Sequence, residues 1–190
     1  MIKKGIVVAF PGTGYTCREK LFQQCFEPFA QMHYERIEID FSMIPFKEIE
    51  TIEEAFELAK TEVIRQLEGV ALEQYADVVF LAKSFGTGLA GWYARQRELT
   101  PRFFLLTPTE TALEWLEPQS RLTGAVIGTE DHVLDFWRLK DFCAQRRTPC
   151  LVFEGVGHKL MAQSDEDTAA INARIVDFMV KQMQLVHTPA

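Results

Sequence analysis

Apolar residues along the chain form short runs that alternate with longer segments of helical spacing. Runs of this length, bounded by turn residues, predict β-strands. The predicted strands are residues 5–10, 36–40, 77–82, 102–106, 124–128 and 150–154. Four of them are almost continuously apolar, which is typical of strands covered on both faces of a parallel sheet. Residues 36–40 (RIEID) alternate apolar and charged side chains, so we expect this strand nearer an edge.

The segments between the strands carry apolar residues three or four positions apart, the spacing of one helix face. In residues 51–68 this stripe consists of Ile52, Ala55, Phe56, Ala59, Val63 and Leu67. Residues 165–184 have similar spacing after an acidic start, which suits a helix N-terminus. The alternation predicts an α/β fold: a three-layer α/β/α sandwich around a mostly parallel sheet of about six strands. We expect residues 1–190 to form a single domain.

The composition argues against several classes of function. The formal net charge is −7, so the chain lacks the excess basic charge that nucleic acids and anionic membranes attract. No apolar stretch approaches the length of a membrane span, and residues 5–10 are too short for a signal peptide, so we expect a cytoplasmic protein. The cysteines have neither C-x-x-C nor zinc-ligand spacing, and we expect reduced thiols: Cys17, Cys25, Cys143 and Cys150.

Residues that could take part in catalysis or binding follow the predicted strands. In parallel sheets, ligands bind beyond the carboxyl ends of the strands. The turn Pro11-Gly12-Thr13-Gly14 follows the first strand, Ser84 the third, Asp131 the fifth and His158 the sixth. A serine hydroxyl becomes a good nucleophile when a base accepts its proton and a third group orients that base. A serine, an acid and a histidine at one edge of a sheet have the residue types that this requires.

The segment after the third strand supports two interpretations. Gly86, Gly88 and Gly91 spell G-x-G-x-x-G, a dinucleotide-binding pattern that also needs an acid at the end of the next strand. That strand is followed by Thr107 instead. A nucleotide-binding, Rossmann-like protein is therefore an alternative interpretation, and close packing of the following helix on the sheet also explains the glycines.

Ser84, Asp131 and His158, in this order and each after its own strand, resemble the α/β-hydrolase superfamily over nearly the whole chain. The segment Ala82-Lys83-Ser84-Phe85-Gly86 is similar to its nucleophile elbow, G-x-S-x-G, with alanine at the first small position. The resemblance implies a minimal α/β-hydrolase fold and a serine hydrolase that cleaves a small ester or thioester through an acyl-enzyme on Ser84. A non-catalytic binding module with the same fold is a further alternative.

The resemblance also implies a role for each of these residues. Ser84 is the nucleophile, His158 is the general base and acid, and Asp131 orients the imidazole. Glu130 and Asp135 are neighbouring acids; Asp131 is preferred because its turn, GTED, is similar to the superfamily's strand–G-x-x-D turn.

The oxyanion hole and the substrate contacts are likewise implied by the resemblance. The backbone N–H groups of Thr13 and Phe85 are the expected oxyanion donors, with Pro11 standing where the superfamily's His-Gly motif has histidine. Tyr15 and Trp115 are candidate substrate-binding residues. With Phe85 and Phe136 they are the candidate lining of an apolar acyl pocket, although aromatic residues at such positions more often belong to the core.

Two lysines and three histidines lie outside the predicted triad, oxyanion hole and aromatic pocket. Lys83 and Lys159 either attract an anionic substrate or point to solvent, and Lys83 is a candidate substrate-binding residue. His132 is a candidate substrate contact, whereas His33 and His187 are expected at the surface.

The interval between the fourth and fifth strands has room for one helix, at residues 110–116, and not for the helical lid of many superfamily members. We therefore expect a small-molecule acyl substrate as the partner, with no cofactor and no metal. Ester, thioester and amide substrates, hydrolysis and acyl transfer, and the oligomeric state all stay open.

Overall fold

The computed structural model of the chain describes residues 3–184. Within these residues, six strands form one parallel sheet with the strand order β2-β1-β3-β4-β5-β6. The strands are β1 (Lys3–Phe10), β2 (Glu35–Glu38), β3 (Tyr75–Lys83), β4 (Arg102–Leu106), β5 (Arg121–Glu130) and β6 (Cys150–Gly157). All six predicted strands are confirmed, and the alternating segment lies at a sheet edge, with residues 36–38 in β2 and residues 39–40 beyond its end.

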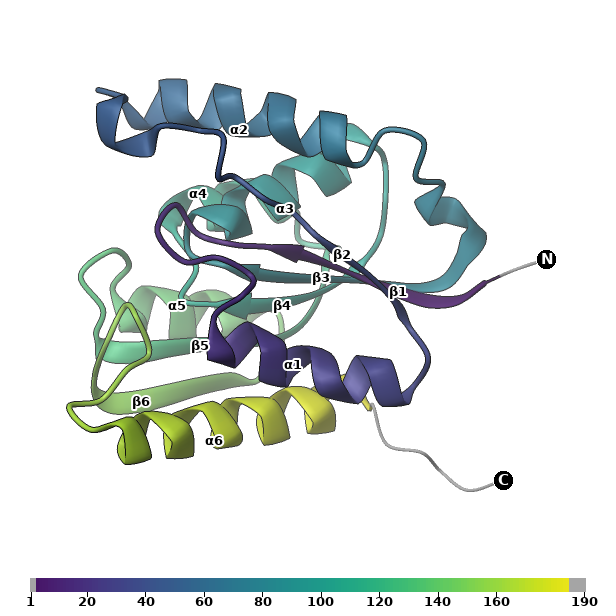
Figure 1. Ribbon diagram of the computed structural model, residues 1–190. Coiled ribbons are helices and arrows are strands. Elements are labelled where there is room, and N and C mark those ends of the chain that lie inside the picture. The colour runs from purple at the N-terminus through teal and green to yellow at the C-terminus, as the bar shows by residue number, and fades with distance from the viewer. Residues whose placement is uncertain (1–2, 185–190) are drawn as a thin grey trace, which may run out of the picture.

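Helices cover both faces of this sheet (Figure 1). One face is covered by α1 (Lys20–Gln31) and α6 (Asp165–Met183). The other is covered by α2 (Ile52–Gln66), α3 (Phe85–Gln96), α4 (Glu110–Trp115) and α5 (Phe136–Gln145). Two short 3-10 helices, η1 (Phe46–Glu48) and η2 (Leu72–Gln74), lie in the connections. The predicted three-layer α/β/α architecture is confirmed.

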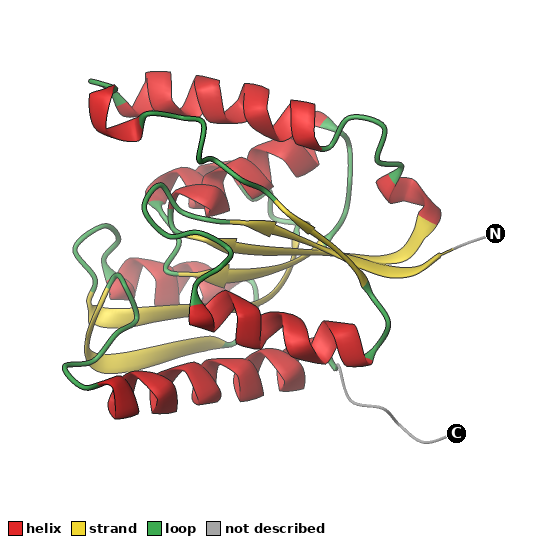
Figure 2. Cartoon of the chain, in the orientation of Figure 1, coloured by secondary structure: helices red, strands yellow, loops and turns green. Residues whose placement is uncertain are grey.

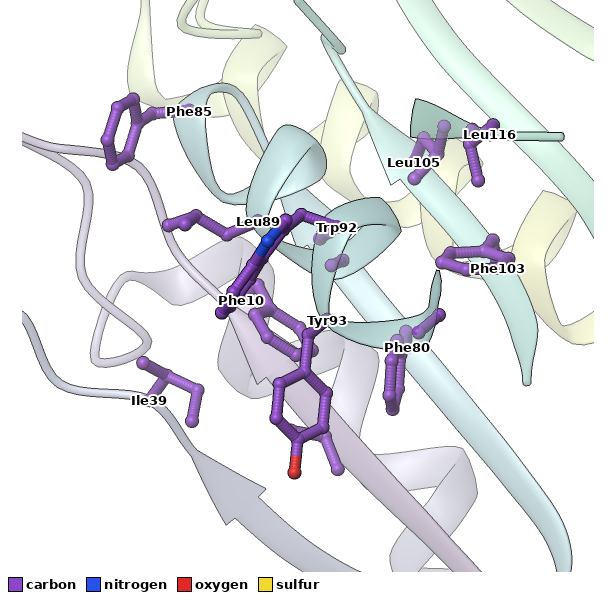
Figure 3. Close-up of a cluster of buried hydrophobic side chains, with 14 of the residues drawn as sticks. Phe10, Ile39, Phe80, Phe85, Leu89, Trp92, Tyr93, Phe103, Leu105 and Leu116 are labelled. Carbon is purple, nitrogen blue, oxygen red and sulfur yellow. The ribbon is translucent and has the colours of Figure 1, made fainter. Parts of the chain in front are cut away.

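The continuous apolar runs serve two cores because successive strand side chains point to opposite faces. In β1, Val7 and Ala9 face α1 and α6, whereas Val8 and Phe10 face the opposite helices. On that second face the Phe80 ring lies 5.0 Å from the Phe10 ring and contacts further aromatic side chains (Figure 3). Alternation therefore explains why the central strands have no polar face.

The helical stripes are largely confirmed. Ala55, Ala59 and Val63 of α2 are buried, whereas Ile52, in the first turn, is 60% exposed, so the buried stripe begins at Ala55.

Among residues 3–184, no helix is both long and apolar enough to span a membrane. In Figure 2, the loops that follow β1, β5 and β6 gather at one end of the sheet, and the candidate site lies there.

Candidate active site

Ser84 lies in a sharp turn between β3 and α3. Its backbone has φ 52° and ψ −127°, a conformation that costs a non-glycine residue on the order of 1–3 kcal/mol. The turn is fixed by a hydrogen bond from the Ser84 N–H to the Leu106 carbonyl, 3.0 Å. Gly86 lets α3 begin directly beside β1, because a Cβ atom there would lie 2.2 Å from the Phe10 carbonyl oxygen. The elbow geometry therefore depends on a glycine two residues after the serine.

The other two glycines of the G-x-G-x-x-G pattern face neighbouring helices. A Cβ atom on Gly88 would lie 3.1 Å from Thr111, and one on Gly91 would lie 2.9 Å from Trp115. Both therefore make room for the α4 region, and the expectation that they pack α3 on the sheet is wrong for these two. The pattern is explained by close packing of elements and needs no bound phosphate.

The structure brings Ser84, Asp131 and His158 together from the ends of three strands. His158 Nε2 lies 2.7 Å from Ser84 Oγ, and His158 Nδ1 lies 2.8 Å from Asp131 Oδ2. The Asp131 side chain is fully buried, whereas the His158 side chain is 14% exposed. Hydrogen bonds therefore connect the serine hydroxyl through the imidazole to a buried carboxylate.

Local hydrogen bonds select Asp131 among the neighbouring acids. Burial raises the pKa of the Asp131 carboxyl, but hydrogen bonds from His158 and from the backbone N–H groups of Val133 and Leu134 outweigh it, so the pKa lies below its usual value. Asp135 instead caps α5, where it accepts a hydrogen bond from the Trp137 N–H at 2.8 Å. Asp131 is therefore the carboxylate that faces His158.

His158 reaches Asp131 because β6 approaches β5 very closely near the ends of the two strands. The register between the two strands shifts between Gly128 and Glu130. A Cβ atom on Gly128 would lie 1.8 Å from the Val156 carbonyl oxygen, so only glycine permits this approach. Gly155 adds a left-handed turn, with φ 68°, just before the histidine. The two glycines thus direct the loop after β6 toward the end of β5.

Lys83 occupies a different place from either predicted one. Its side chain is 1% exposed, and its Nζ donates to Thr107 Oγ1 at 2.8 Å and to the His158 carbonyl oxygen at 3.0 Å. Burial lowers the pKa of Lys83 to about 7, partly offset by Asp131. Lys83 therefore neither points to solvent nor presents its amine to a substrate, because that amine is enclosed beneath the histidine. Lys159 is exposed, in agreement with the expectation that it points to solvent.

The turn of residues 11–15 lies against Ser84. A Cβ atom on Gly12 would lie 3.3 Å from Ser84 Cβ, and the Gly12 N–H closes the turn on the Tyr15 carbonyl at 3.1 Å. Thr13 is exposed at the tip, and Phe85 is the first residue of α3. Within residues 3–184, neither the Thr13 nor the Phe85 backbone N–H is hydrogen-bonded to an acceptor. Both amides are thus available as donors near the serine.

The two aromatic candidates for substrate binding do not meet at Ser84. Tyr15 is half-buried; its ring lies 5.9 Å from Phe22 on α1 and 4.8 Å from Lys83 Nζ. Trp115 packs on Gly91, two helical turns along α3 from the serine, and lines a separate hollow of about 360 Å³. The structure therefore places Trp115 in the packing of α3 and α4, and its predicted role is wrong for this reason.

A larger hollow lies beside the 11–15 turn, and its lining includes Gly12, the residue that lies against Ser84. It has a volume of about 840 Å³ and is lined by parts of residues 11–18 and 38–48. Its apolar wall includes Phe41 and Phe46, whose rings lie 6.4 and 5.5 Å from the Phe85 ring. Phe41 and Phe46 were not predicted from the sequence. The signal that points to them is the largely apolar segment FSMIPF, which has neither strand nor helix spacing.

The remaining histidines divide between the site and its surroundings. The exposed His132 ring lies 5.9 Å from the His158 ring, so it borders the site. His33 is exposed at the end of α1, and His187 lies outside the described residues. Among residues 3–184, no group of three or more His, Cys, Asp or Glu side chains is arranged to hold a metal ion.

Comparisons with known proteins identify the fold. No family model matches the chain, and no curated protein matches it significantly. Three similar solved structures cover most of the chain. An alpha-beta serine hydrolase homologue from Coxiella burnetii is 17% identical with a TM-score of 0.59, covering 93% of this chain and 86% of its own.

The other two similar structures cover a comparable share of the chain. Est1E from Butyrivibrio proteoclasticus, with bound ferulic acid, is 12% identical with a TM-score of 0.62, covering 97% of this chain and 91% of its own. A dienelactone hydrolase from Anabaena variabilis is 14% identical with a TM-score of 0.62, covering 94% and 87%. This chain therefore has the α/β-hydrolase fold.

Proposed function

We propose that the protein is a serine hydrolase that cleaves a carboxylic ester or thioester through an acyl-enzyme on Ser84. The observation that carries the proposal is the hydrogen-bonded chain from Ser84 Oγ through His158 to Asp131, at 2.7 and 2.8 Å. The similar structures support it, since they include a serine hydrolase homologue and a dienelactone hydrolase. The positive φ of Ser84 supports it too, because strained backbone is retained mainly at functional sites.

The first half of the reaction forms the acyl-enzyme. Ser84 Oγ attacks the substrate carbonyl carbon while His158 Nε2 accepts the hydroxyl proton. Asp131 stabilises the imidazolium that forms, and the Thr13 and Phe85 N–H groups donate to the oxyanion of the tetrahedral intermediate. When the intermediate collapses, His158 returns the proton to the leaving alcohol or thiol and the acyl group stays on Ser84.

The second half releases the acid. A water molecule attacks the acyl carbonyl, and His158 accepts one of its protons. Collapse of the second tetrahedral intermediate breaks the bond to Ser84 Oγ, and His158 gives the proton back to the serine. The enzyme returns to its starting protonation state, and the net reaction is hydrolysis.

The hollow beside the 11–15 turn is the proposed site for an apolar part of the substrate. Its wall contains Phe41 and Phe46, and its rim carries both basic and acidic side chains, including Arg18 and Glu48. The mixed rim offers no preference for a strongly charged group, whereas the aromatic wall favours an uncharged acyl or alcohol chain. Ferulic acid bound to Est1E supports a group that contains an aromatic ring as one candidate.

Covalent labelling of Ser84 tests the proposal. The protein and its Ser84→Ala variant are incubated with a fluorophosphonate, and the intact mass of each is measured. Ser120→Ala serves as the matched control, because Ser120 lies in a turn before β5, far along the chain from the elbow. An adduct on the parent and on Ser120→Ala, but not on Ser84→Ala, is the expected result.

An unlabelled parent protein would favour the alternative of a non-catalytic binding module. A folded parent that forms no adduct contradicts the serine-hydrolase proposal and favours a binding module. If the parent is labelled, kcat/KM for matched acetyl and butyryl esters and thioesters then determines which bond is preferred.

A further inference from the structure

Lys83 is a buried amine whose direct partners carry no charge. Lysine is almost never fully buried unless it is paired, yet the Lys83 Nζ donates to a hydroxyl, Thr107 Oγ1, and to a backbone carbonyl, that of His158. Its position is also unusual, since it directly precedes Ser84 and reaches beneath the site to the histidine. The proposed reaction gives this group no role.

We propose that Lys83 is a positioning residue for His158: its hydrogen bond to the His158 carbonyl holds the loop after β6 in the place from which the imidazole reaches Ser84. The consequence for catalysis rests on the proposed function of His158. The effect on the place of the imidazole rests only on the contacts of Lys83.

The hydrogen bonds of Lys83 join three strand ends. The side chain starts at the end of β3, contacts Thr107 just after β4 and holds the His158 carbonyl just after β6. A neutral amine has two N–H donors and an ammonium has three. Both protonation states therefore satisfy the two acceptors, and the third donor of the ammonium has the Tyr15 ring beside it, 4.8 Å away. Protonation of Lys83 therefore leaves its two hydrogen bonds in place.

Lys83 changes its charge near neutrality. Burial lowers the pKa of Lys83 to about 7, and Asp131 partly offsets this. Since either form of the amine satisfies both acceptors, its hold on the His158 carbonyl persists on both sides of that pH.

Three variants separate hydrogen bonding from general surface charge. Lys83→Met removes both the charge and the donors, Lys83→Gln removes the charge and keeps an N–H donor, and the exposed Lys159→Met is the matched control. The His158 ring signals are recorded by NMR and assigned through His158→Asn. The rate of Ser84 labelling by the fluorophosphonate is measured for each variant.

Lys83→Met is expected to shift the His158 ring signals and to lower the maximal labelling rate about 10-fold relative to Lys83→Gln, because it no longer holds the His158 carbonyl. Lys159→Met is expected to match the parent in both measurements. Unshifted ring signals or equal maximal rates in Lys83→Met and Lys83→Gln overturn the positioning role. If the parent is never labelled, the serine-hydrolase proposal fails, while the NMR signals still decide the effect of Lys83 on His158.

Discussion

Gly86→Ala tests whether the site depends on the close approach of α3 to β1. The new Cβ atom would lie 2.2 Å from the Phe10 carbonyl oxygen and 2.4 Å from that of Pro11, and both obstacles are backbone atoms. An ordinary C···O contact is about 3.4 Å, so the two segments must separate by about 1 Å. Overpacking of this kind costs about 1–3 kcal/mol, and we expect the upper end because no flexible side chain can move aside.

Thermal unfolding and labelling measure the two consequences. A loss of about 3 kcal/mol corresponds to a fall in Tm of roughly 6–12 °C for a chain of this size. A displacement of about 1 Å at Ser84 is expected to slow fluorophosphonate labelling about 100-fold. Gly14→Ala is the stability control, because a Cβ atom there has no neighbour within 4 Å. A Gly86→Ala variant with the Tm and labelling rate of the parent would refute this account of the elbow.

Three further predictions concern the acid, the buried lysine and the hollow. Asp131→Asn is expected to slow Ser84 labelling by a factor on the order of 10⁴, whereas Asp135→Asn is expected to leave it within about twofold because asparagine also caps helices well; equal effects would contradict the assignment. Folded Lys83, with its pKa lowered to about 7, binds fewer protons than unfolded lysine from there to about pH 10, so stability gains from this group as pH rises through that window. Chemical denaturation should therefore show the unfolding free energy of the parent, relative to Lys83→Met, rising by about 1.4 kcal/mol per pH unit between about pH 7.5 and 9.5, and a flat difference would argue against the lowered pKa. Phe46→Ala is expected to lower kcat/KM about 10-fold for butyryl relative to acetyl esters, since burial of each CH₂ is worth about 0.8 kcal/mol. An unchanged ratio would show that the butyryl group of the substrate does not bind in the hollow.

The sequence was sufficient to predict the sheet because each central strand must be apolar on both faces. It also located Ser84, Asp131 and His158, since the carboxyl ends of parallel strands meet at one edge and few polar residues follow those strands. The ends of β5 and β6 ran further than predicted, to Glu130 and Gly157, because polar and glycine residues there continue the pairing without apolar side chains.

The contacts that depend on long-range packing were beyond the sequence pattern. Lys83 is polar in a strand end, and nothing local indicates that Thr107 and the His158 carbonyl would enclose it. Trp115 and Phe46 are both aromatic residues in connections between strands, and only the packing of α4 on α3 and of residues 38–48 on Phe85 distinguishes them.

The position of β6 affects when the site can form during protein synthesis. This strand pairs with β5 alone, at the edge of the sheet, and it carries the loop that holds His158. A nascent chain that has folded through β5 already contains Ser84 and Asp131, but the serine has no base. Docking of the last strand then supplies the base, so a ribosome-bound fragment that ends before residue 150 should be inert toward a fluorophosphonate. The Ser84 hydroxyl thus becomes reactive only after the last strand of the growing polypeptide has paired with β5.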